Sequence, residues 1–161
     1  MSGEDLKAKT LEGFERMFNQ GDLTHVEEAH APAAVDHQEP LGTDFTEHLK
    51  DVITKMRRAF PDLHFEVDDI VREGDIVATR STMTGTHLGR FDMGPLAAIE
   101  PQGTKVAVRH MHFFEYEDGR VKDLWHMWDT LGLMRQLGAP APDMRLGVPQ
   151  PLAAEAGRTE Q

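Results

Sequence analysis

The sequence predicts an α+β protein in which helices come first and cover one face of a curved, mostly antiparallel sheet. Three observations support this class. Apolar residues recur at helical spacing before Pro61, the period changes to two from Leu63 onward, and turn residues then interrupt the chain at strand-length intervals. Helices followed by a run of antiparallel strands are typical of an α+β domain, and a sheet curved around helices leaves an internal cavity.

Three helices are expected before the first long strand, over residues 4–19, 22–28 and 43–59 or 43–60. The first carries Leu6, Phe14 and Phe18 on one face. Asp22 is expected to cap the second, because its carboxylate can accept free N–H groups of the first turn. An extended piece around Val35 separates the second helix from the third.

Two antiparallel hairpins follow, with strands expected at 63–72 and 76–87, and at 104–116 and 120–128. The segment 88–103 between them is too irregular for a strand, so it is either a lid over a pocket or a surface loop. Asp129 caps a last helix over 130–137, which Gly138 ends. We therefore expect a single domain over residues 1–138 and a proline-rich, partly disordered tail over 139–161.

The composition excludes several classes of partner. Seventeen Lys and Arg against 28 Asp and Glu give the 161-residue chain a formal charge of -11, and so acidic a surface repels phosphate backbones and anionic headgroups. Neither nucleic acid nor a membrane is expected as a partner. Cysteine is absent, which rules out disulfides and thiolate metal sites. The N-terminus has no apolar run of signal-peptide length, so the expected location is cytoplasmic.

The second hairpin carries the candidate chemistry. Side chains alternate along a strand, so His110, His112 and Phe114 share the more apolar face of the first strand. His126 lies on the returning strand. Its face depends on the turn, because a one-residue shift of register sends every side chain to the opposite face.

Two registers are open. A two-residue turn at Asp118-Gly119 sets His112 opposite Trp125 and turns His126 away. A three-residue turn that ends at the same glycine, with the glycine in a left-handed bulge, sets His110 opposite His126. Only the second register brings all three histidines together.

Three sequence segments resemble the SnoaL-like polyketide cyclases: THLGRF at 86–91, the histidine hairpin with its EDGRV turn, and the terminal WDTLGLMRQLG. A looser similarity begins at the first helix and includes AFPD at 59–62. The resemblance implies the cone-shaped α+β barrel of the nuclear-transport-factor superfamily, with an internal cavity and a homodimer or higher homo-oligomer. It also implies an intramolecular aldol condensation without metal or cofactor, in which an aspartate is the general acid/base beside a histidine and an asparagine.

Carried over by position, the family histidine falls on His112, the glutamine two residues before it on His110, and the asparagine on Asp36. The catalytic aspartate falls on His126. This departure leaves the fold expectation intact, while the aldol chemistry does not follow automatically. The similarity also favours the register that clusters the histidines.

His126 is the leading candidate for general acid/base, because an imidazole titrates near neutral pH. His112 is the candidate donor to a developing enolate oxygen. Asp129 either orients an imidazole or is only a helix cap. Substrate contacts are expected from Asp36 and His37 at the cavity mouth and from three residues of the hairpin: His110, Phe114 and Trp128.

Other interpretations remain open. Three imidazoles on one hairpin suit zinc or iron, although the resemblance implies neither metal nor cofactor, and we predict none. The expected function is a cofactor-independent, polyketide cyclase-like enzyme of secondary metabolism, such as antibiotic biosynthesis, acting on a hydrophobic small molecule. The alternatives are a hydroxylase-like homologue in polyketide tailoring and a non-catalytic small-molecule binding protein.

Overall fold

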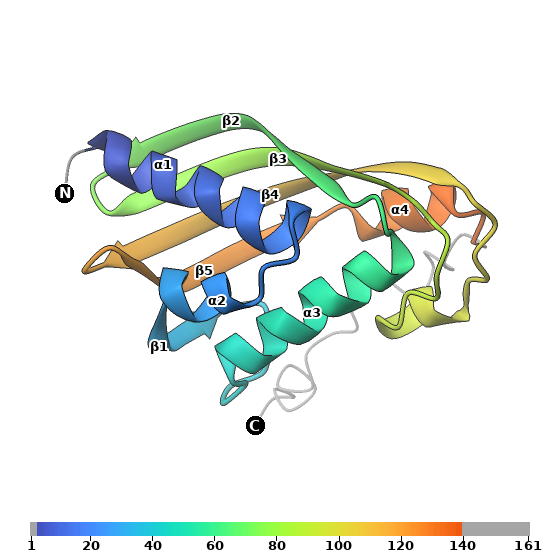
Figure 1. Cartoon of the computed structure of the whole chain (residues 1–161), viewed down its shortest axis with the longest axis horizontal. Coiled ribbons are helices and arrows are strands. Elements are labelled where there is room, and N and C mark those ends of the chain that lie inside the picture. The colour runs from blue at the N-terminus through green and yellow to red at the C-terminus, as the bar shows by residue number, and fades with distance from the viewer. Residues whose placement is uncertain (1–2, 140–161) are drawn as a thin grey trace, which may run out of the picture.

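The computed structural model describes residues 3–139, and its helices precede most of its strands (Figure 1). The helices are α1 (Gly3–Gly13), the π-helix η1 (Phe14–Asn19), α2 (Thr24–Ala29), α3 (Phe45–Ala59), the 3-10 helix η2 (Gly94–Ala98) and α4 (Thr130–Gln136). The strands are β1 (His30–Asp36), β2 (His64–Glu73), β3 (Ile76–Thr86), β4 (Lys105–Glu117) and β5 (Arg120–Trp128). The predicted tail falls almost entirely outside the described residues.

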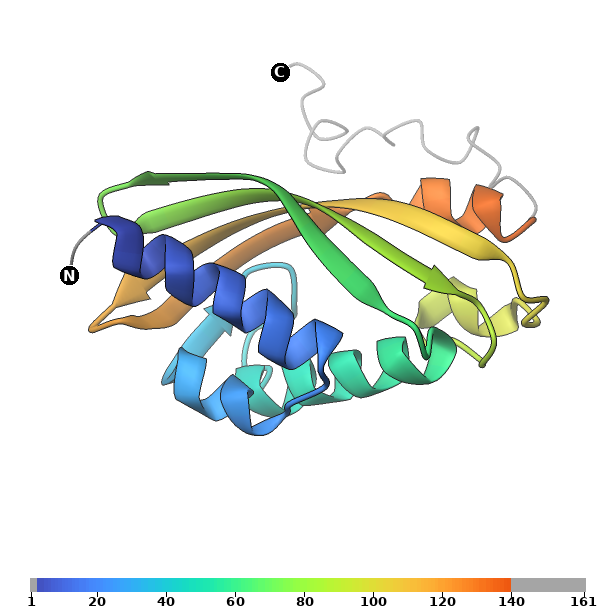
Figure 2. The same ribbon diagram turned by 45° about the horizontal axis from the view of Figure 1, so that its top comes forward.

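The five strands form one sheet in the order β1-β5-β4-β3-β2. All neighbours are antiparallel except β1 and β5, which are parallel. Figure 2 shows the sheet bending over α1, α2 and α3, with the main apolar core between the two layers. The predicted α+β class, with helices on one face of a curved and mostly antiparallel sheet, is confirmed.

The helices agree with the sequence pattern in place but differ in detail. The predicted first helix is α1 continued by the wider turns of η1, where the N–H of Gln20 bonds the carbonyl of Glu15 five residues back (2.9 Å). Asp22 accepts the N–H of Thr24 (3.1 Å), although the residue at the N-cap of α2 is Leu23. Helix α3 begins after Asp44, whose side chain accepts the N–H of Glu47 (3.0 Å).

The histidine hairpin combines a two-residue turn with a bulge. Asp118 and Gly119 have positive φ angles of 49° and 74°, as a type I′ turn requires. Beyond the turn, Tyr116 pairs with Val121 but Glu115 pairs with Asp123, so one extra residue bulges out of β5. Next to the turn the register is that of the predicted two-residue turn, and beyond the bulge it differs from both predicted ones.

That extra residue is Lys122, and it moves all later pairs by one position. His112 therefore lies opposite His126. The two predicted registers had instead paired His112 with Trp125 or His110 with His126. The three histidines share the inner face of the sheet, as the resemblance implied, but a bulge brings them there instead of a three-residue turn.

The segment 88–103 is anchored in the core and is not a loose surface loop. Phe91 and Leu96 are buried in the main apolar cluster. The backbone N–H groups of Leu88 and Gly89 both bond the carbonyl of Ala59 at the end of α3 (3.0 and 3.1 Å). No helix within residues 3–139 is both long and apolar enough to cross a membrane.

Candidate active site

A cavity of about 150 Å³ lies between the helices and the inner face of the sheet. Helical residues such as Phe14, Phe18 and Met56 supply one wall, and β4 and β5 supply the other. From β4 and β5 the cavity is lined by His110, His112, Phe114, Tyr116, Val121, Leu124, His126 and Trp128, and His30, Asp36 and Phe65 of β1 and β2 add to this wall. An apolar enclosure with a few convergent polar groups is the usual form of a small-molecule site.

The histidines form a row of nearly parallel rings on the cavity wall. The ring centroids of His110 and His112 are 5.7 Å apart with an interplanar angle of 11°, and those of His112 and His126 are 5.9 Å apart with an angle of 21°. Two further aromatic rings stack on the same face, Phe114 at 5.5 Å from His112 and Trp128 at 5.6 Å from His110. Alternation along β4 and the β5 bulge together produce this arrangement.

Two of these imidazoles are buried and neutral at pH 7. Burial lowers the pKa of His110 to about 3, with a further contribution from the charge of His126. Burial also lowers the pKa of His112 well below its ordinary value, and the charges of His110 and His126 add to this. Nε2 of His110 and Nδ1 of His112 are buried without a hydrogen-bond partner among residues 3–139. Such unsatisfied buried polar atoms are uncommon in native structures, and here two of them belong to imidazoles of the cavity wall.

His126 is held by Asp36 at the end of β1. Strand β1 pairs with β5, and Nε2 of His126 lies 3.1 Å from Oδ2 of Asp36, whose side chain is only 8% exposed. Burial acts to raise the pKa of Asp36. The hydrogen bonds from His126 and the N–H of Gln38, together with the charges of His126 and His48, outweigh it, so the pKa is lowered.

The Asp36 carboxylate is thus ionised at neutral pH, and an ionised carboxylate only accepts hydrogen bonds. Nε2 of His126 must therefore carry the proton in this pair. In a neutral ring, Nδ1 is then the nitrogen that can accept a proton. A carboxylate in this position also stabilises the imidazolium form once the ring is protonated.

The other predicted site residues divide into two groups. His110, Phe114 and Trp128 line the cavity. His37 does not: its Nε2 lies 2.7 Å from Oδ1 of Asp123, and its ring stacks on Trp125 at 4.4 Å.

Asp129 also lies outside the cavity lining. Its exposed side chain accepts the N–H of Gly132 (2.7 Å) and caps α4. Of its two predicted roles, the structure displays the helix cap, and no contact between Asp129 and an imidazole is present among the described residues. We therefore leave His37 and Asp129 out of the proposed site.

Several lining residues had no predicted role, and among them are the polar side chains of His30, Glu39 and His48. His48 belongs to the apolar stripe of α3, at helical spacing from Phe45 and Val52, and this spacing was a usable signal. Glu39 lies in the turn between β1 and α3, where no local sequence pattern indicates a cavity residue. Burial lowers the pKa of His30 to about 4.

The curved five-stranded sheet, the helices that cover it and the cavity between them define a SnoaL-like protein. Residues 8–137 match the SnoaL-like polyketide cyclase family, and the chain belongs to it.

Among characterised relatives, the chain is 27% identical over 112 residues to the aklanonic acid methyl ester cyclase DnrD of Streptomyces peucetius, covering 69% of this chain and 72% of that protein. It is also similar to the structure of TsrD from Streptomyces laurentii, at 28% identity and a TM-score of 0.75, over 87% of this chain and 99% of TsrD. AclR from Streptomyces galilaeus, provisionally named a hydroxylase, matches at 27% identity and a TM-score of 0.73, over 91% of this chain and 90% of AclR.

Proposed function

We propose that this protein is a cofactor-independent, polyketide cyclase-like enzyme that uses general acid/base chemistry on a polyketide or polycyclic carbonyl compound in secondary metabolism. The observation that carries the proposal is the 3.1 Å contact between Nε2 of His126 and Oδ2 of Asp36 inside the cavity. It gives the histidine at the position of the family aspartate a defined tautomer and an electrostatic partner. Similarity to an ester cyclase supports the substrate class.

In this mechanism His126 begins the reaction. Its Nδ1 removes a proton from the carbon next to a substrate carbonyl, and Asp36 stabilises the resulting imidazolium. The neutral ring of His112 donates a hydrogen bond to the enolate oxygen that forms. The enolate carbon attacks a second carbonyl of the same substrate, and His126 returns its proton to the new alkoxide, so no external redox partner is needed.

A second candidate is a hydroxylase-like tailoring activity, which the similarity to AclR favours. Hydroxylation requires an oxidant and, for molecular oxygen, electrons from a reductant or a flavin supplied by another protein. The cyclase proposal requires neither. Dependence of product formation on added reductant therefore separates the two candidates.

We also propose that the protein is a homodimer that packs through the outer face of β4 and β5. Four large apolar side chains are exposed there in two cross-strand pairs: Met111 with Met127, and Phe113 with Trp125. An exposed apolar patch of this kind is typical of a protein interface. Analytical ultracentrifugation of the wild type and Phe113→Glu should show a dimer and a monomer, respectively.

The catalytic proposal is tested with an aromatic polyketide methyl ester as substrate for the purified chain. His126→Ala should lower turnover by about 100-fold or more, since general acid/base catalysis typically contributes that much. His64→Ala, which removes an exposed histidine of β2, is the matched control and should leave turnover unchanged. Undiminished turnover in His126→Ala removes this residue from the mechanism. Ligand binding without product in every variant, the wild type included, indicates a non-catalytic binding protein.

A further inference from the structure

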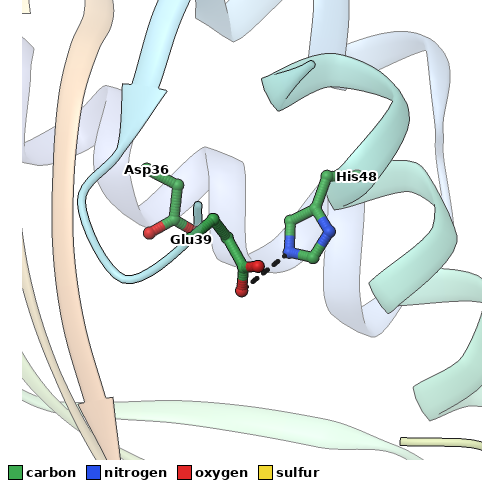
Figure 3. A group of neighbouring side chains, drawn as sticks. All are labelled: Asp36, Glu39 and His48. Atoms are coloured by element: carbon green, nitrogen blue, oxygen red, sulfur yellow. Dashed lines mark ion pairs between the residues drawn. The ribbon is translucent and has the colours of Figure 1, made fainter. Parts of the chain in front are cut away.

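Three side chains that line the cavity lie close to one another: Asp36, Glu39 and His48 (Figure 3). They come from the end of β1, the turn that follows it and the first turns of α3. Nε2 of His48 lies 3.3 Å from Oε1 of Glu39. One ligand atom from each of the three residues lies within 4.8 Å of the other two.

The charge of this group is not balanced by a permanent cation. Asp36 contacts the imidazole of His126, and Glu39 contacts the imidazole of His48. Among the described residues that line the cavity, Lys9 is the one lysine or arginine, and its Nζ donates to the carbonyl of Gly119 (3.2 Å). Two carboxylates therefore lie at the cavity with no lysine or arginine paired to them among the residues that line it.

We propose that Asp36, Glu39 and His48 bind a divalent first-row cation such as Mn²⁺ or Zn²⁺. Two carboxylates and one imidazole are a ligand set that both ions accept, and together with the ion they carry no net charge. Because Glu39 lies in a turn and the side chains of Glu39 and His48 are partly exposed, a small closure would bring the ligand atoms to coordination distance. A cation with three protein ligands keeps further coordination positions open, and here these face the cavity.

The proposed cation site shares Asp36 with the His126–Asp36 pair of the candidate active site. Oδ2 of Asp36 contacts His126 and Oδ1 accepts the N–H of Gln38 (2.9 Å), and each carboxylate oxygen still has a free lone pair for a metal. The cation site does not depend on the acid/base role of His126. The cation would lie beside the histidine row and takes no part in the proton transfer proposed for His126.

The test is the binding of Mn²⁺ and of Zn²⁺ to the full chain, measured by isothermal titration calorimetry and, for Mn²⁺, by electron paramagnetic resonance. One equivalent of either cation should bind the wild type. Glu39→Gln and His48→Gln should each weaken its affinity at least about 10-fold, because each removes a ligand. Circular dichroism establishes that the variants are folded.

Glu66→Gln is the matched control. Glu66 contacts His64 on β2 in a similar carboxylate–imidazole pair (3.4 Å), but the pair is exposed and outside the cavity. Its removal should leave the affinity unchanged. No binding at millimolar cation, or equal affinity in the wild type, Glu39→Gln and His48→Gln, overturns the proposal. Neither outcome bears on turnover by His126, so the two proposals fail separately.

Discussion

His112 and His126 lie directly opposite each other across β4 and β5, because one extra residue bulges out of β5 before Asp123. In an unbulged hairpin with the same turn, His112 would face Trp125 and His126 would point away from the cavity. The cluster of three imidazoles therefore depends on a single irregularity of the sheet.

The register can be checked by engineered disulfides, because the chain has no cysteine of its own. Phe113 and Trp125 are directly paired on the outer face. Phe113→Cys with Trp125→Cys should oxidise readily, since opposed residues lie within the span of a disulfide. Phe113→Cys with Asp123→Cys, which the three-residue turn would have paired, should oxidise much more slowly. Non-reducing electrophoresis measures both, and the opposite ranking contradicts the bulged register.

The sequence pattern identified the elements better than the register. The periods of 3.6 and two placed α3 and the four long strands within two residues of their observed ends. The bulge left a trace that could have been used: Val121 and Leu124 are both buried, so two consecutive non-core residues between them break the alternation of β5. That break, more than the turn, decides which face His126 takes.

Parts of the site could not be predicted from local patterns. The pairing of β1 with β5 brings Asp36 to His126 across 90 residues of sequence, and no local period reports such a contact. The Asp36 position was obtained only through the family resemblance. The position of Glu39 at the cavity depends on the path of the turn between β1 and α3. His37 directly follows β1, whose residues His30 and Asp36 line the cavity, but its ring stacks on Trp125 at the outer face of β5.

The burial of His110 predicts a pH dependence of stability. The pKa of His110 is lowered to about 3 in the fold, against about 6.5 for an unfolded chain. Between these values the unfolded state binds one more proton, so the free energy of unfolding falls as the pH falls from about 6.5 toward 3. The stability that neutral His110 contributes is therefore fully present only at a pH above the pKa of the unfolded chain, about 6.5.

Urea unfolding at pH 6 and pH 5 measures the effect. His110→Gln should lose less stability over this interval than the wild type, by about 1.4 kcal/mol per pH unit for one proton. His64→Gln, which changes an exposed histidine, should have the slope of the wild type. Equal slopes in the wild type and His110→Gln would show that His110 is not buried as a neutral ring.

The anchoring of the 88–103 segment predicts a strict requirement for glycine at position 89. A Cβ atom there would lie 2.2 Å from the carbonyl oxygen of Arg58, which is backbone and cannot rotate away. Gly89→Ala should therefore lower the free energy of unfolding by about 1–3 kcal/mol. The adjacent Leu88 is 61% exposed. Leu88→Ala should therefore change the free energy of unfolding by less than about 0.5 kcal/mol. Thermal denaturation of both variants provides the comparison.

The central claim is that Asp36 acts on the reaction through His126, and a double-mutant cycle on kcat/KM tests it most directly. Asp36→Asn alone should lower kcat/KM by about 10-fold or more, because the tautomer of His126 and the stability of its imidazolium are lost. In the His126→Ala background the same substitution should have almost no further effect, since residues that act as a unit are not additive. Losses that multiply in the double variant would contradict the account, because Asp36 would then act independently of His126.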